Sequence, residues 1–387
     1  MKDFSLSALI AGFITVLVGF TSSAIIVFQA AHALGASAAE AGSWMWALGL
    51  GMGLTSIGLS LRYRTPVAIA WSTPGAALLI TSGHGISMPE AIGAFVVTGA
   101  LIMLVGFTGW FERAMKKLPM ALASAMLAGI LLRFGLDVFA SMKTQFLMIF
   151  PMFALYLPLR RHAPRYAVLG ALVLGCTIAW SQGQLHAPAI SFTLTQPVWI
   201  TPQFGWHSII GVALPLFIVT MASQNMPGVA TLHASGYHPP ISPLIGWTGA
   251  ATLLLAPFGA YALNLAAITA AICMGREAHE DPAKRYMAAV SAGAIYCLIG
   301  LFGATVATVF AAFPRELVAA IAGLALLGTI GNGLSMALQD ESQRESALIT
   351  FLVTASGLSL FGIGAAFWGL LAGGAALMVF KRRESVT

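Results

Sequence analysis

Residues 66–83 read PVAIAWSTPGAALLITSG, and residues 257–275 read PFGAYALNLAAITAAICMG. Both stretches are apolar, but each is too short or too interrupted by Pro, Gly and Asn to form an ordinary spanning helix, which needs about 20 apolar residues. Pro74 disfavours helix in the residue before it and is well suited to the first turn of a helix. We therefore predict that each stretch is an extended segment followed by a half-helix.

Polar residues stand where the two half-helices would begin. In the first stretch, residues 67–71 are predicted to be extended, and Ser72 or Thr73 is a suitable N-cap. In the second, residues 258–262 are predicted to be extended, with Asn264 as the candidate cap. Two helix N-termini would then face each other in the membrane and offer unpaired N–H groups to an anion. Two simple kinks in packed helices are the alternative.

The composition is that of a polytopic membrane protein. Of 387 residues, 58% are hydrophobic and 8% are charged, and the mean hydropathy is +0.88. A soluble domain carries about 25% charged residues, so a soluble nucleic-acid-binding protein is excluded despite the net charge of +6. Three cysteines without CxxC spacing predict neither a disulfide framework nor a metal site. The Gly-rich run at 49–53 lacks the context of a phosphate-binding loop and is predicted to pack helices.

At about 20 residues per crossing, the chain divides into fourteen segments. The predicted segments are 8–31, 41–60, 66–83, 89–110, 119–136, 144–159, 166–182, 208–232, 241–256, 257–275, 286–309, 314–333, 347–361 and 362–380. Basic residues between segments gather on one side, with only Arg133, Lys143 and Arg315 on the other, which predicts cytoplasmic N- and C-termini. No Asp or Glu is expected within a segment, because Asp137 falls just past the fifth, where it is expected to pair with Arg133.

The two halves of the chain resemble each other. Val18, Ser22, His32 and Gly35 recur with one constant shift as Val219, Ser223, His233 and Gly236. Ala70-Trp71 recurs in the same order as Ala260-Tyr261, which links the two interrupted stretches. Seven segments per repeat is an odd number, so the second copy is inverted, and interrupted segments at matching positions are typical of a transporter's substrate site. We predict an all-α membrane protein with a first repeat at 1–182, an external connector at 183–207 and a second repeat at 208–387.

Polar and aromatic residues near the breaks are the candidate substrate ligands. Amides at mid-span, as in SQNMPG at 223–228, are costly unless they face partners or a cavity. The predicted substrate-binding residues are Ser22, Ser23, Trp71, Ser72, Thr73, Gly75, Gln224, Asn225, Tyr261, Asn264 and Leu265, with the anion between the helix starts at Gly75 and Leu265 and the ring against Trp71 and Tyr261. Helix packing is the alternative for the serines and amides.

Proton coupling has few candidates. His32 and His233, near the ends of segments 1 and 8, are the candidate proton carriers, with a solvated role at a helix end as the alternative. An acid bound in its protonated form would carry its own proton. No catalytic residue, metal ligand or cofactor is predicted.

The stretches WSTPGAALL (71–79), SQNMPG (223–228) and ALNLAAIT (262–269) resemble the benzoate–proton symporter family (BenE type), which is more distantly similar to uracil/xanthine permeases and sulphate/bicarbonate carriers. The resemblance implies seven-plus-seven inverted repeats, a core domain of 8–110 plus 208–309 and a gate domain of 119–182 plus 314–380, usually in a homodimer. It also implies a bacterial inner membrane location and proton-coupled uptake of benzoate or a similar aromatic acid.

We therefore expect a carrier, and not an enzyme, that imports an aromatic monocarboxylate by alternating access. Its expected partners are the substrate, protons, the lipid bilayer and a second copy of the chain, with no nucleic acid. An inorganic-anion or dicarboxylate exchanger on the same fold is the alternative, followed by a nucleobase permease or a passive channel. Gln224 and Asn225 stand where nucleobase permeases would carry an acidic residue. This difference favours an anionic substrate, because a carboxylate at the site would repel it. A membrane-embedded enzyme is disfavoured, because no nucleophile–base pair or carboxylate pair lies within the predicted segments.

Overall fold

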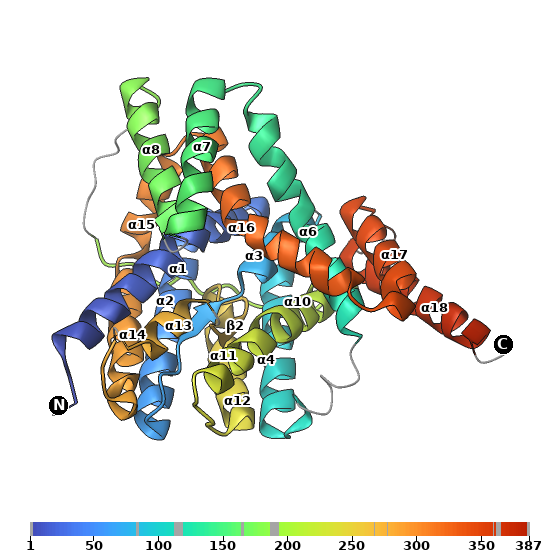
Figure 1. Cartoon of the computed structure of the whole chain (residues 1–387), viewed down its shortest axis with the longest axis horizontal. Coiled ribbons are helices and arrows are strands. Elements are labelled where there is room, and N and C mark those ends of the chain that lie inside the picture. Colours follow the sequence, from blue (N-terminus) through green and yellow to red (C-terminus); the bar gives the residue numbers. More distant parts are fainter. Residues whose placement is uncertain are drawn as a thin grey trace.

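The computed structural model describes residues 3–82, 85–111, 119–163, 166–185, 193–266, 268–276, 278–358, 360 and 365–384, and these are mostly helical (Figure 1). The first half of the chain holds α1 (Leu6–Ala33), α2 (Ala38–Tyr63), β1 (Ile69–Trp71), α3 (Thr73–Ser82), α4 (Met88–Phe107), α6 (Met120–Ser141), α7 (Phe146–His162) and α8 (Ala167–Ser181).

The second half holds α9 (Trp206–Ser208), the π-helix η2 (Ile209–Ala213), α10 (Leu214–Thr220), the π-helix η3 (Met221–Asn225), α11 (Met226–Ala234), α12 (Ile241–Leu255), the 3₁₀ turn η4 (Ala256–Phe258), β2 (Leu263–Leu265), α13 (Ile268–Met274), η5 (Pro282–Lys284), α14 (Tyr286–Leu301), α15 (Gly303–Ala311), α16 (Arg315–Leu338), η6 (Glu341–Gln343), α17 (Arg344–Ala355) and α18 (Ala365–Glu384). The predicted segment 286–309 is interrupted at Phe302, where α14 ends.

The number of crossings is only partly established. Among the described residues, six helices are long and apolar enough to span a bilayer, and α1, which bends by 43°, is a seventh if its two parts form one span. The remaining predicted segments coincide with shorter helices or with the two interrupted stretches. A membrane protein with at least six apolar helices is therefore confirmed, and the count of fourteen stays a prediction.

Both interrupted stretches are broken as predicted, but the second half-helix starts later than expected. Gly75 N donates to Ser72 Oγ at 3.1 Å, so Ser72 caps α3. In the second stretch a left-handed Gly259 (φ 106°) ends η4, and the strand occupies Leu263–Leu265. The prediction that Asn264 caps a helix starting at Leu265 is wrong. Asn264 lies in β2, because its backbone pairs with Ala70 of β1.

Close glycine contacts hold the long helices together in pairs. A Cβ at Gly249 of α12 would lie 2.2 Å from the Met103 nitrogen of α4, and one at Gly49 of α2 would lie 2.6 Å from the Gly300 Cα of α14. Backbones can approach this closely only where side chains are missing, as in many membrane helix pairs. The prediction that the 49–53 run packs helices is confirmed.

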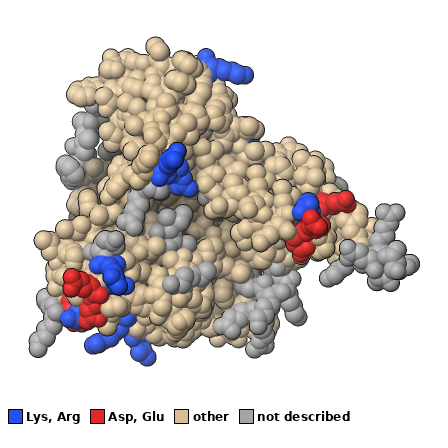
Figure 2. All heavy atoms as spheres, in the orientation of Figure 1, with Lys and Arg blue, Asp and Glu red and all other residues tan. Residues whose placement is uncertain are grey.

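The helices form two groups in Figure 1. Helices α6, α7, α8, α16, α17 and α18 lie along the top and right of this view, whereas α1 to α4 and α10 to α14 fill the lower part. Figure 2 shows that the visible surface is almost free of charge, with the few charged side chains in small patches. This is the surface expected of a protein surrounded by lipid.

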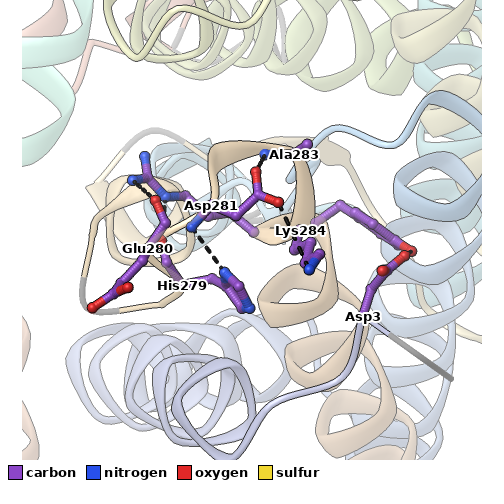
Figure 3. A network of polar contacts seen from close by, with 8 residues as sticks. Asp3, His279, Glu280, Asp281, Ala283 and Lys284 are labelled. Atoms are coloured by element: carbon purple, nitrogen blue, oxygen red, sulfur yellow. Dashed lines mark hydrogen bonds and ion pairs between the residues drawn. The ribbon is translucent and has the colours of Figure 1, made fainter.

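A network of polar contacts joins residues of the loop between α13 and α14 (Figure 3). Arg285 is 9% exposed and donates to the carbonyl oxygens of Met274 (2.9 Å), His279 (2.8 Å) and Glu280 (3.4 Å). Tyr286 Oη donates to Asp3 Oδ2 at 2.8 Å and ties the N-terminal segment to the same loop. A cation at the last carbonyl of α13 complements the negative end of that half-helix.

Arg285→Gln is expected to destabilise the protein by about 1.5–3 kcal/mol, because charge-assisted bonds to buried carbonyls are lost. Arg344→Gln is the matched control, since Arg344 makes an exposed ion pair with Glu341 at 3.3 Å worth at most about 1 kcal/mol. Thermal unfolding of both purified variants in one detergent measures the difference. Equal losses in the two variants would contradict the assigned role of Arg285.

Candidate functional site

The β1–β2 ribbon is the frame of the site, and its outer edges are satisfied by side chains. The two strands pair antiparallel, with Trp71 opposite Leu263. On the outer edge of β1, Ile69 N donates to Ser56 Oγ of α2 at 2.9 Å. On the outer edge of β2, Leu263 N donates to Thr252 Oγ1 of α12 at 3.0 Å. Because no water reaches such edges in an apolar interior, these hydroxyls are what permits a ribbon there.

A cavity of about 640 Å³, here called the central cavity, lies between the ribbon and helices α1, α6 and α16. Its polar lining consists of Ser23, Thr73, Ser124, Ser223, Gln224, Thr269, Tyr296, Asn332 and Ser335. Its apolar lining includes Val18, Met52, Trp71, Met120, Leu127, Met226 and Met336. None of the described residues that line it is charged. The volume suits a small organic ligand.

Trp71 is held rigidly at the cavity wall. Its Nε1 donates to Ser23 Oγ at 2.8 Å, and Ser23 Oγ in turn donates to Gly19 O at 2.8 Å. The Phe20 ring lies 5.6 Å from the Trp71 ring, centroid to centroid. This pairing across α1 and β1 presents an indole of fixed orientation to the cavity, where it can contact a flat ring. Ser23 thus lines the central cavity and also bonds the indole and the α1 backbone.

The N-terminus of α3 opens into the same cavity through Thr73. Pro74 has no N–H, and the Gly75 N–H is already bonded to Ser72 Oγ, which itself accepts a hydrogen bond from Thr220 Oγ1 at 3.1 Å. In the part of the chain that the structure describes, the Thr73 N–H has no partner. Thr73 therefore offers an N–H and a hydroxyl at the positive end of a helix dipole.

Two π-helices shape the segment that carries the amides. In η3 (Met221–Asn225) the widened turn directs Gln224 to the cavity and Asn225 away from it. Asn225 is fully buried, and its Oδ1 accepts from Leu265 N at 2.9 Å. π-bulges are frequent at functional sites because they re-aim single side chains. Of the two predicted amides, the structure brings only Gln224 to the cavity.

Several other predicted ligands lie behind the cavity wall. Asn264 is buried, and in the amide orientation that satisfies both of its polar atoms Oδ1 accepts from Ser72 N and Nδ2 donates to Leu265 O, both at 3.0 Å. Tyr261 packs against the Trp44 and Phe95 rings at 5.9 and 6.1 Å and does not reach the cavity. The remaining predicted ligands absent from its lining are Ser72, Gly75, Asn225 and Leu265. The side chain of Ser22 lies outside the described residues. The side chains of Ser72, Asn225 and Asn264 support the ribbon and the start of α3, because their polar atoms are bonded to backbone groups.

The two predicted proton carriers lie away from the central cavity. His233 is exposed, and its ring lies 4.9 Å from that of His238. His32 lines a second cavity together with Arg133 and Asp137. Asp137 lies inside α6, which continues to Ser141, so the prediction that no acid lies within a helical segment is wrong. The expected Arg133–Asp137 ion pair is also absent from the described contacts.

The α6 and α16 side of the central cavity was not predicted from the sequence. Ser124 comes from α6, and Asn332 and Ser335 come from α16. Asn332-Gly333 in the middle of an apolar helix is a signal that could have been used, since amides there face partners or a cavity. Thr269 and Tyr296 complete the polar lining from α13 and α14.

Comparison with solved structures identifies the fold first. The fold matches the transmembrane domain of a cyanobacterium bicarbonate transporter BicA, with a TM-score of 0.60 and 14% identity over 95% of this chain and 97% of that chain. It also matches the murine Slc26a9 anion transporter in the inward-facing state, with a TM-score of 0.58 and 12% identity over 98% and 69% of the two chains. The chain therefore has the fold of these membrane transporters.

The family follows from sequence. Residues 2–379 match the BenE family, described as benzoate membrane transport protein. The Inner membrane protein YdcO of Escherichia coli (strain K12) is 51% identical over 98% of each chain. The Benzoate membrane transport protein of Acinetobacter baylyi is 42% identical over 99% of this chain and 98% of that one. The chain belongs to the BenE benzoate membrane transport family, as its motifs predicted.

Proposed function

We propose that the protein imports benzoate or a similar aromatic monocarboxylate into the bacterial cell across the inner membrane. The observation that carries this proposal is the central cavity, which combines a helix N-terminus at Thr73 with a fixed indole and apolar walls in a member of the benzoate transport family. The carboxylate would bind the Thr73 N–H and hydroxyl and the Gln224 amide, with the ring against Trp71. A fixed cation is unnecessary because the helix dipole favours the anion.

The helix contacts support an inverted repeat. Helices α2 and α14 pack together, as do α12 and α4. These two pairs would exchange under the two-fold axis that an inverted repeat requires. Glycines seven residues apart, Gly99 and Gly106 in α4 and Gly293 and Gly300 in α14, contact the partner helices in both pairs. Fourteen segments in seven-plus-seven repeats, with both termini cytoplasmic, remain our proposal.

We infer that the two helix groups of Figure 1 are a core and a gate that move against each other. The central cavity is lined from both groups, by Thr73 and Gln224 on one side and by Ser124 and Asn332 on the other. Relative motion of the groups would expose it to either side in turn. A homodimer through the gate is part of the same proposal.

Uptake of labelled benzoate by proteoliposomes tests the function. Saturable uptake that an inward-acid pH gradient stimulates would support proton symport, and a pH gradient without effect would reject it. Competition by sulphate or succinate at equal concentration would instead favour an inorganic-anion or dicarboxylate exchanger.

Gln224→Leu is expected to raise the KM for benzoate about tenfold or more, because a hydrogen bond to a charged group is worth about 1.5–3 kcal/mol. Thr231→Val is the matched control, since Thr231 lies on α11 and lines neither cavity. Initial uptake rates against benzoate concentration measure both variants. An unchanged KM in Gln224→Leu would remove this residue from the site.

A further inference from the structure

A second cavity of about 710 Å³ carries the charges that the central cavity lacks. Arg133, Asp137 and Arg315 line it, together with His32. We call it the arginine cavity. Two guanidinium groups and one carboxylate line it, so the cavity favours an anion.

The arginine cavity and the central cavity lie along one interface. Helices α1, α3, α6 and α16 contribute residues to both. Along α3, Thr73 lines the central cavity, and Ile80 and Thr81, two turns further on, line the arginine cavity. Along α3 and α6, the buried residues Leu79 and Leu131 lie between the positions that line one cavity and those that line the other. A ligand path along this interface would therefore include both cavities.

The position of Arg133 needs an explanation. It lies in the helical stretch Met120–Ser141, eight residues before the end of α6, which is about 12 Å along the axis. A charge in a membrane helix costs about 2.5–3.5 kcal/mol or more unless it faces a partner or a water-filled cavity. Neither Arg133 nor Arg315 makes an ion pair or hydrogen bond within the described ranges. Both are exposed to the cavity.

The remaining walls fit a ring with one negative group. Phe28, Phe134 and Phe313 line the arginine cavity beside the two arginines. Gln29 adds a buried Oε1 with no partner among the described residues. Aromatic walls with convergent polar groups are typical of sites for small aromatic ligands. An inorganic anion would leave these walls unused.

We propose that the arginine cavity is a second binding site for the aromatic carboxylate, in which Arg133 and Arg315 hold the carboxylate before or after it occupies the central cavity. The assignment of the ligand rests on the proposed function. Guanidinium groups bind carboxylates through paired, charge-assisted hydrogen bonds. Under the proposed orientation the site faces the periplasm and concentrates the substrate at the entrance of the path.

Binding of labelled benzoate to the purified chain in lipid nanodiscs tests the proposal. We expect two benzoate sites per chain. Arg133→Gln and Arg315→Gln should each raise the Kd of the same site, the arginine cavity, about tenfold or more. Gln224→Leu should weaken the other site. Lys143→Gln is the matched control, because it removes an exposed charge near the same end of α6 without touching either cavity. One site per chain, unaffected by both arginine substitutions, would overturn the proposal.

A second measurement needs no substitution. Benzoate should slow modification of Arg133 and Arg315 by phenylglyoxal, followed by peptide mass spectrometry, and leave the exposed Arg62 unprotected. Equal rates with and without benzoate would overturn the proposal. Wild-type protein that transports benzoate but shows neither protection nor a second site contradicts only this inference. Protection of the arginines without any benzoate uptake contradicts only the proposed function.

Discussion

Replacing Gly249 by valine is expected to leave little folded protein. A Cβ at this position would lie 2.2 Å from the Met103 nitrogen and 2.6 Å from its Cα, and both atoms belong to the backbone of α4. A helix backbone cannot give way as a side chain can, so α4 and α12 must separate. We expect a cost of about 3 kcal/mol or more, at the upper end of overpacking effects. The yield of monodisperse protein and its thermal unfolding measure this loss.

Gly58→Val is the matched control for this substitution. Gly58 lies within α2, is exposed, and a Cβ there would meet nothing within 4 Å. The same change of residue should therefore leave yield and unfolding temperature close to those of the wild type. Similar losses in both variants would show that glycine flexibility, and not close helix packing, explains the effect at Gly249.

The breaks in the two half-spanning stretches could be predicted because Pro74 and Gly259 act locally. Proline restricts the residue before it, and Gly259 adopts the positive φ that other residues avoid. The strand register could not be predicted, because it depends on hydroxyl groups from α2 and α12 that are distant in sequence. Asn264 was consequently placed at a helix start, although it pairs with Ala70 in the ribbon.

The central cavity was predicted on one side only. Thr73, Trp71, Ser23 and Gln224 could be found because they lie beside sequence breaks or in matched positions of the repeat. Tyr261 matched Trp71 in the repeat but lies in the core, because Trp44 and Phe95 enclose its ring. Repeat symmetry gives equivalent backbone positions, but different neighbours decide what each side chain contacts.

Replacing Gln224 or Asn225, the adjacent amides of η3, by leucine is expected to impair the protein in two different ways. Asn225→Leu should lower stability by about 1–3 kcal/mol, because the buried Leu265 N–H loses its acceptor. The 2.9 Å bond to Asn225 Oδ1 is what fixes the last residue of β2 before α13. Transport should be lost with it, since β2 and the start of α13 support the wall that contains Ala266 and Thr269.

Gln224→Leu provides the matched comparison, because it changes the neighbouring amide in the same π-helix. Gln224 lines the central cavity and makes no hydrogen bond to another described residue. Its replacement should raise KM and leave the unfolding temperature unchanged, whereas Asn225→Leu should lower the unfolding temperature and the maximal rate. Thermal unfolding and uptake kinetics on both proteins separate the two roles. The opposite pattern would place Asn225 against the substrate and Gln224 in the supporting frame.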